Sequence, residues 1–333
     1  MNPEQQERSE REQAVRTLPP APYPEPAPGR LRARRQHLLN EVDRQARPAH
    51  SRPARRQGRR LALVLGAAAV AGATVFVLGL GTGDGTSPRK AAPASAASVQ
   101  LLERAALTAA AGPLPKVRAE QYAYVKVIGH TTVLSEDAAG EMERLREDES
   151  MEQWTSVNGG ERTLQRKGGQ DQLLPDAPGK GNLNSPTYTF LAGLPTDPDA
   201  LLKRIYEDVE KNHGSGSDST TGPDQEAFVT IGDLLRTSAA PPATTAALYR
   251  AAALIPGVVV VPDAVDAAGR KGVAVARVHD GERFEWIFDK DTVRLLGERT
   301  VLLKDNAWGK AGTAVTSVAV MSSGIVNGSG QTP

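Results

Sequence analysis

The sequence contains no cysteine among its 333 residues, and only 4% of those residues are aromatic. Without cysteine the chain forms no disulfide, offers no thiolate to a metal ion and has neither a thiol nucleophile nor a site for a cysteine-linked lipid. Any folded part must therefore be stabilised by packing alone. The small aromatic content also means that few large rings are available to build a core.

Sequence signatures of enzymes are missing as well. There is no GxSxG, HExxH or GxxxxGK[ST] motif, and the glycine-rich run 79–85 lacks the third glycine of a dinucleotide fingerprint. Beyond residue 60 the only histidines are His130, His213 and His279, and none has a second histidine at ligand spacing. We therefore expect a protein that is not an enzyme, with no catalytic, cofactor-binding or metal-binding residues and no cofactor.

Charge is unevenly distributed along the chain. Residues 1–60 hold fourteen arginines, no lysine and seven acidic residues, a formal charge of +7, whereas the whole chain carries +1. Nine prolines in the same stretch disfavour a packed core, so we predict a basic and mostly disordered arm with one short helix near 30–47. Arginines without interleaved aromatic residues or a recognised nucleic-acid fold do not indicate specific nucleic-acid binding.

One long apolar run follows the arm. Residues 61–80 carry no charge, and at 1.5 Å per residue they span about 30 Å, the thickness of a bilayer core, so we predict a transmembrane helix. Arginines cluster immediately before the run and are absent just after it, which places the N-terminus in the cytoplasm and the C-terminus outside the cell. The membrane-flanking arginines are Arg52, Arg55, Arg56, Arg59 and Arg60.

The pair Arg59-Arg60 ahead of an apolar run also permits a twin-arginine export signal, with cleavage near Ala94-Ser95-Ala96. The sixty residues before the run are long for such a leader, and the small residues lie well beyond its apolar end. A retained membrane anchor is therefore the preferred interpretation.

After the run, residues 81–97 are rich in Gly, Ser, Ala and Pro and are typical of a flexible tether. We expect an external domain over 98–322, with Ser98 as the first helix cap, and a disordered tail over 323–333. Helices are predicted at 98–112, 197–213, 227–235 and 243–254, and strands at 122–134, 152–157, 161–167, 258–261, 273–279, 283–288, 293–303 and 315–321. Helices and strands are thus segregated along the chain, which predicts an α+β domain with a curved antiparallel β-sheet.

Two groups of side chains in this domain are candidates for a site. Trp154, Trp286 and Trp308 fall in predicted strands or loops, where they either line a ligand groove on the open face of the sheet or belong to its core. Acidic residues also gather between 141 and 149, interleaved with Arg144 and Arg146. Such a mixture indicates a solvated face more often than a pair of catalytic carboxylates.

Several short motifs carry a resemblance to a known family. They are Leu194–Leu201, Ala247–Ala251, Ile255–Val258, Gly272–Ala274 and Ile287–Asp289. Over roughly residues 100 to 305 the chain resembles an uncharacterised family of actinobacterial single-pass membrane proteins. Genes of that family often lie beside those of extracytoplasmic-function sigma factors, which the resemblance implies as a context. The order of elements is also distantly similar to the open, curved sheets of bacterial envelope carriers and stress sensors that bind lipoproteins.

These observations lead to two functional hypotheses. The first is a non-enzymatic envelope protein, a sensor or regulator whose external domain binds a ligand or protein while the arm contacts a cytoplasmic protein, with a sigma factor as one candidate. The second is a carrier of a lipid or other apolar molecule in a groove of the sheet. Both expect the lipid bilayer as a partner and a location in the cell membrane.

Overall fold

The computed structural model describes residues 92–113, 116–136, 142–175, 178–213 and 222–333. The basic arm, the predicted span 61–80 with its flanking arginines and most of the tether lie outside these residues, so those expectations stay predictions. Among the described residues, no helix is long and apolar enough to cross a bilayer.

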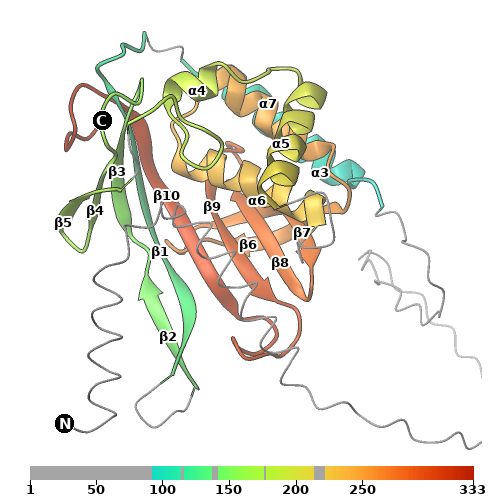
Figure 1. Ribbon diagram of the computed structural model, residues 1–333. Coiled ribbons are helices and arrows are strands. Elements are labelled where there is room, and N and C mark those ends of the chain that lie inside the picture. Colours follow the sequence, from blue (N-terminus) through green and yellow to red (C-terminus); the bar gives the residue numbers. More distant parts are fainter. Residues whose placement is uncertain (1–91, 114–115, 137–141, 176–177, 214–221) are drawn as a thin grey trace, which may run out of the picture. The chain divides into compact units, whose positions relative to one another are not determined.

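One antiparallel sheet of ten strands organises the domain (Figure 1). Nine strands follow the order β5-β4-β3-β1-β10-β9-β8-β7-β6, and β2 pairs with β1 beyond the end of β3. The strands are β1 Tyr122–Glu136, β2 Met142–Asp148, β3 Met151–Ser156, β4 Leu164–Lys167, β5 Gln170–Leu173, β6 Val258–Val265, β7 Lys271–His279, β8 Glu282–Phe288, β9 Leu295–Leu302 and β10 Ala314–Val326.

The described helices lie on one face of this sheet, over β6 to β9, except for the short helix 188–192, which is hydrogen-bonded to Val157 just after β3 (Figure 1). They are α3 Ala96–Ala110, α4 Tyr188–Ala192, α5 Pro198–His213, α6 Gly222–Thr237 and α7 Pro242–Ala253. The main core cluster joins their apolar side chains to those of Val258, Val275 and Phe288 on the sheet. The predicted α+β class, with an antiparallel sheet and segregated helices, is confirmed for this part of the chain.

A stacked pair of rings lies where α6 meets β8. Phe228 and Trp286 are parallel within 4°, with ring centroids 4.0 Å apart, and both are almost completely buried. A Cβ at Gly232 would lie only 2.5 Å from Nε1 of Trp286, so a glycine at this position lets α6 approach the ring. The pair fixes the distance between the helical layer and the sheet.

The opposite face of the sheet is stabilised by charge. The Glu285 side chain has no exposed surface and accepts hydrogen bonds at 2.6 Å from Nε of both Arg283 and Arg299. Both arginines are partly exposed, so the carboxylate is buried while the positive charges keep contact with water. A buried carboxylate held by two guanidinium groups keeps its charge compensated.

The chain enters the domain along the edge strand β6. Ser95 is the residue that caps α3, because its Oγ accepts a hydrogen bond from the backbone of Ser98; the sequence had predicted Ser98 itself as the cap. Ser98 is instead buried, and its Oγ donates to the carbonyl of Val258 at 2.9 Å. Ser95 N donates to that same carbonyl, and Gly257 N donates to the carbonyl of Ala92 at 2.7 Å. The entry point is therefore fixed to β6 by three hydrogen bonds.

The end of the domain also differs from the prediction. Strand β10 continues to Val326, and the residues after it fold back over β3 instead of forming a disordered tail from 323. Nε1 of Trp154 donates to the carbonyl of Gln331 at 2.5 Å, and Asn327 accepts hydrogen bonds from Arg118 and Gln121. These contacts order the segment, which composition alone had classed as mobile.

Candidate functional site

The three tryptophans proposed as a ligand groove lie in different places. Trp154 is fully buried in a small cluster with Tyr124 and Val326, whereas Trp286 belongs to the main core under α6. Trp308 is partly buried in the loop between β9 and β10. The structure does not bring the three rings together, because two of them are used as core on separate parts of the sheet.

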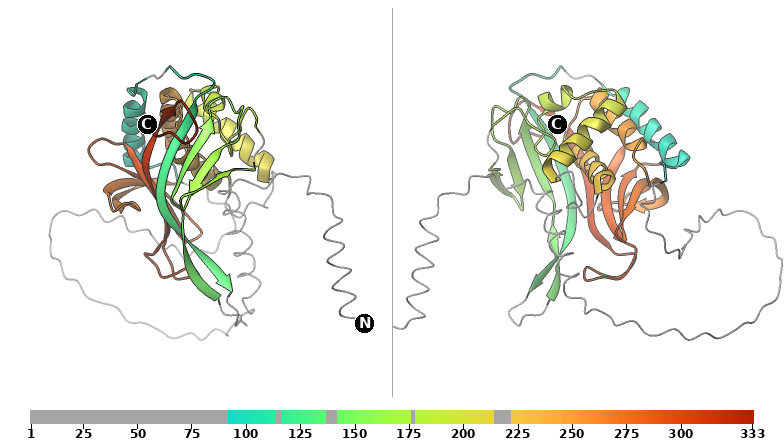
Figure 2. Two further views of the ribbon diagram at one scale, coloured as in Figure 1. Left: turned by 90° about the vertical axis from the view of Figure 1, so that its left-hand side faces the viewer. Right: turned by 45° about the vertical axis from the view of Figure 1, so that its right-hand side comes forward.

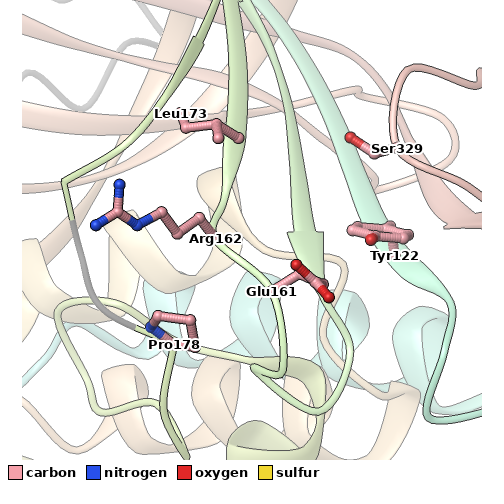
Figure 3. Close-up of a pocket in the computed structure, with 6 residues that line it drawn as sticks. All are labelled: Tyr122, Glu161, Arg162, Leu173, Pro178 and Ser329. Carbon is pink, nitrogen blue, oxygen red and sulfur yellow. The ribbon is translucent and has the colours of Figure 1, made fainter.

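A surface hollow of about 440 Å³ lies at the end of β4 and β5 (Figure 3). Its lining residues are Tyr122, Glu161, Arg162, Leu173, Pro178 and Ser329. The Glu161 carboxylate points toward the Tyr122 ring, and the Arg162 side chain extends to the opposite side, away from Tyr122 (Figure 3). The hollow borders the Trp154 cluster without including any of the three tryptophans.

A projecting ribbon is the most exposed feature of the described domain. We call the paired segments His130–Glu136 of β1 and Met142–Asp148 of β2 the β1–β2 ribbon. It extends past the rest of the sheet, on the side away from the helices (Figures 1 and 2). All seven residues of β2 are exposed, including the apolar side chains of Met142, at 58%, and Leu145, at 39%.

Both edges of the ribbon are open over part of their length: β10 pairs with β1 only as far as Thr131, and the outer edge of β2 is open as well. Strands β2 and β3 lie end to end along the same side of β1, and the step between them is fixed where Glu149 N donates to the carbonyl of Gly129. Strand β4 covers the outer edge of β3. Within the part of the chain that the structure describes, no strand covers the outer edge of β2. The backbone groups along that edge are thus available to a strand from another molecule.

Strand alternation sorts the charges of β2 onto two faces. Glu143, Leu145 and Glu147 pair with Ser135, Val133 and Thr131 of β1 and form what we call the glutamate face. Met142, Arg144, Arg146 and Asp148 form the opposite, arginine face. Sequence reasoning found this acidic cluster and read it as a solvated face, but it did not find the strand or its separation of charge.

Two side chains of the arginine face already make contacts within the domain. Nε of Arg144 donates to the carbonyl of Ala307 in the β9–β10 loop at 2.7 Å, and Nη2 of Arg146 lies 2.8 Å from Nδ1 of His130. Burial, together with the positive charge of Arg146, lowers the pKa of His130. The imidazole is therefore held neutral at ordinary pH and accepts from the guanidinium.

The glutamate face has no such partners. Among the described residues, neither Glu143 nor Glu147 makes a hydrogen bond or ion pair, and the side chains opposite them on β1 are those of Ser135 and Thr131. Two carboxylates therefore flank the exposed Leu145 without a counter-charge. This face and the free edge beside it form the candidate docking surface.

The described ranges give no support for a metal site or a pair of catalytic carboxylates. No three His, Asp or Glu side chains within them approach one another closely enough to hold a metal ion. The acidic cluster is spread along a strand, where alternate side chains point to opposite faces. It therefore offers an extended surface for contact and no converging carboxylates.

Comparison with known proteins gives little further guidance. No protein-family model and no curated sequence matches the chain. The chain is similar to the crystal structure of MucB, with a TM-score of 0.22 and 12% sequence identity. The aligned region covers 72% of this chain and 62% of the MucB chain, less than two thirds of its length. A likeness at this level carries no functional argument, and the resemblance to the actinobacterial family stays a prediction.

Proposed function

We propose that this chain is a non-enzymatic protein of the cell envelope, a sensor or regulator whose α+β domain binds another protein through the β1–β2 ribbon. The observation that carries the proposal is the free edge of β2, in which seven consecutive residues are exposed and paired on one side only. Extended segments of partner proteins bind by adding to sheet edges of this kind.

The charge pattern of the arm and the predicted span supports a location in the cell membrane. In the proposed arrangement residues 61–80 cross the cell membrane once, the arm stays in the cytoplasm and the domain is outside. The arm is then free to contact a cytoplasmic protein, with a sigma factor as one candidate, while the ribbon contacts an external one. A signal passing between the two would make the protein a regulator.

The carrier hypothesis has less support. It assigned an apolar cargo to a groove lined by tryptophan, yet Trp154 and Trp286 are 0% and 3% exposed and pack against their own clusters. Helices and their side chains also cover the sheet face above β6 to β9. A protein partner at the ribbon needs neither ring.

Photo-crosslinking in the native host tests the proposed docking surface. A photoreactive residue at Leu145 in the full chain should form a crosslink to a specific envelope protein. The same residue at Gln100, exposed on α3, serves as the control because it lies on a helix away from the ribbon. A partner captured equally at both positions, or at neither, would rule out the ribbon as the docking surface.

A separate experiment tests on which side of the membrane the domain lies. Alkaline phosphatase matures only outside the cytoplasm, so its fusion after Pro333 should be active. An inactive fusion, with a cytoplasmic reporter active at the same point, would place the domain inside the cell and remove the case for an external partner.

A further inference from the structure

We infer that the ribbon recognises an extended segment in which two basic residues flank an apolar one at alternate positions, in the order basic, any, apolar, any, basic. The segment would pair with the free edge of β2 as an added strand. This inference rests on the proposed function, because it names the kind of partner that the same surface accepts.

The spacing on the glutamate face sets this order. Glu143, Leu145 and Glu147 occupy alternate positions of β2, so their side chains leave the same face about 7 Å apart. A strand paired with β2 places its own alternate residues opposite these three. Basic residues then face Glu143 and Glu147, and an apolar residue faces Leu145. Because the order is the same in both directions, a parallel or an antiparallel strand satisfies it.

The domain contains an internal example of this pairing. Strand β4 covers the edge of β3, the strand that continues the line of β2, and there Arg166 pairs with Glu152 and Leu164 pairs with Trp154. Nη1 of Arg166 lies 3.9 Å from a carboxylate oxygen of Glu152, and its guanidinium lies 5.0 Å from the centre of the Trp154 ring. On β3 the acidic and apolar residues are thus already met by a basic and an apolar residue. On β2 the corresponding acidic and apolar residues face β1 on one side, and no strand of the described ranges lies on their outer side.

Charged side chains on a sheet edge also serve to prevent unwanted pairing. That role requires charges that repel or break an added strand whatever its sequence. Here the charges are sorted by face, and those of the arginine face are engaged with Ala307 and His130. On the glutamate face, Glu143 and Glu147 make no ion pair with a described residue, so this face of the edge repels acidic strands and attracts basic ones.

Binding of two synthetic peptides to the full chain in nanodiscs of neutral lipid tests the inference. The peptide Thr-Lys-Thr-Val-Thr-Lys-Thr places both lysines and the valine on one face. The control, Thr-Thr-Lys-Val-Lys-Thr-Thr, has the same composition but places its lysines on the face opposite the valine. Fluorescence anisotropy of the labelled peptides should show roughly tenfold tighter binding of the first, given the worth of cross-strand pairs. Equal binding would overturn the inference.

Variants of the chain identify the surface. Glu143→Gln combined with Glu147→Gln should remove the preference for the first peptide. The matched control is Glu136→Gln with Glu161→Gln, which removes the same charge from exposed positions, one on the arginine side of the ribbon and one at the hollow. If the control variant loses the preference as well, general charge attraction explains the binding and the inference falls.

The added strand itself has a separate signature. N-methylation at every second residue of the first peptide removes hydrogen-bond donors from one edge of the peptide only. Methylation of only the odd or only the even residues leaves one edge able to pair, in one of the two strand directions, whereas methylation of every residue blocks both edges and should abolish binding. Binding that survives methylation of every residue would contradict strand pairing.

The peptide and crosslinking experiments test different claims, so their failures can be told apart. A partner captured at Leu145 but not at Gln100, together with equal peptide binding, would keep the proposed function and overturn the strand inference. Tighter binding of the first peptide without a crosslinked partner would keep the strand inference and overturn the proposed function. Self-association of the chain through the ribbon, seen by sedimentation and lost in the Glu143→Gln, Glu147→Gln variant, would replace the partner protein with a second copy and overturn the inference.

Discussion

The helix-covered part of the sheet and the β1–β2 ribbon belong to one sheet but differ in what covers them. Over β6 to β9, side chains such as Phe288 and Ile255 are completely buried between helices and sheet. Along β2 all seven residues are exposed. Packing free energy is therefore concentrated in the first region. Under the proposed function, stability and recognition belong to separate parts of one sheet, and each prediction below probes that separation.

The largest effect is expected in the helix-covered part. Trp286→Ala removes a buried ring stacked on Phe228, and losses of this kind cost about 3–5 kcal/mol of unfolding free energy. Leu145→Ala on the ribbon should change it by less than about 0.5 kcal/mol, because that side chain is exposed. Urea denaturation followed by circular dichroism measures both. Comparable losses for the two variants would show that the ribbon also contributes to the core.

A smaller loss is expected for Glu285→Gln. The substitution leaves Arg283 and Arg299 without their shared carboxylate, and since both arginines are partly exposed we expect about 2 kcal/mol, below the range for a fully buried pair. The control is Glu207→Gln, which breaks an exposed pair with Lys203 on α5 and should cost less than about 0.5 kcal/mol. Equal denaturation midpoints for the two variants would mean that the buried carboxylate adds nothing to stability.

Removing residues 328–333, which fold over β3, should have a weaker effect. The truncation takes away the carbonyl that accepts from Nε1 of Trp154, at a cost of about 1–2 kcal/mol, and brings water to the ring. With Trp286 and Trp308 replaced by phenylalanine, the emission of Trp154 should shift to longer wavelength. Gln331→Ala is the control, because the acceptor is a backbone oxygen that this substitution keeps. A shift in the control as large as in the truncation would contradict the assigned contact.

The smallest expected effect is a pH dependence of the folding stability, caused by His130 on the ribbon. Because burial and Arg146 lower the pKa of His130, the unfolded chain binds a proton more readily than the folded one below the ordinary pKa of about 6.5. Stability should therefore fall as the pH drops from 7.5 to 5.5. His130→Gln should show a smaller fall in urea midpoint over that range. An identical fall in both proteins would assign the effect to other groups.

Much of the fold follows from local sequence patterns. The five strands β6 to β10 were predicted because alternating apolar residues are separated by clear turn signals, and Asp280 and Gly281 do adopt the positive φ values of 48° and 82° that such a turn needs. Helix α5 was likewise marked by Asp197 as its cap and by an apolar face, and the pair Pro241-Pro242 separated the two helices that follow. Such elements depend on neighbours within a few residues, so sequence alone identifies them.

Features that depend on distant residues were not predictable. Trp286 could be recognised as core only by knowing that Phe228, far away in the sequence, stacks on it. Strand β9 was expected to begin at Val293, yet that residue has a φ of 56°, rare for a β-branched side chain, and the strand starts at Leu295. The Val293 side chain is 5% exposed in the main core, so tertiary packing outweighs its local preference.

Sequence patterns predicted only part of the candidate docking surface. The charges between 141 and 149 were identified as solvent-exposed, and β2 is indeed exposed along its length. They were not identified as a strand because Met142 and Leu145, its two apolar residues, do not alternate. Strand pairing with β1, and the separation of glutamates from arginines that follows, required the register.

The hydrogen bonds that tie the chain entry to β6 have a mechanical consequence. A pull applied to the chain ahead of Ala92 would be resisted first by the bonds of Ala92 with Gly257 and of Ser95 with Val258. Behind them, α3 is clamped to α7 by the ion pair of Glu103 with Arg250. Tension therefore enters at the β6 edge, five strand pairings away from β1. In the proposed arrangement, a pull from the membrane side would load the β6 edge of the sheet and leave the shape of the ribbon unchanged.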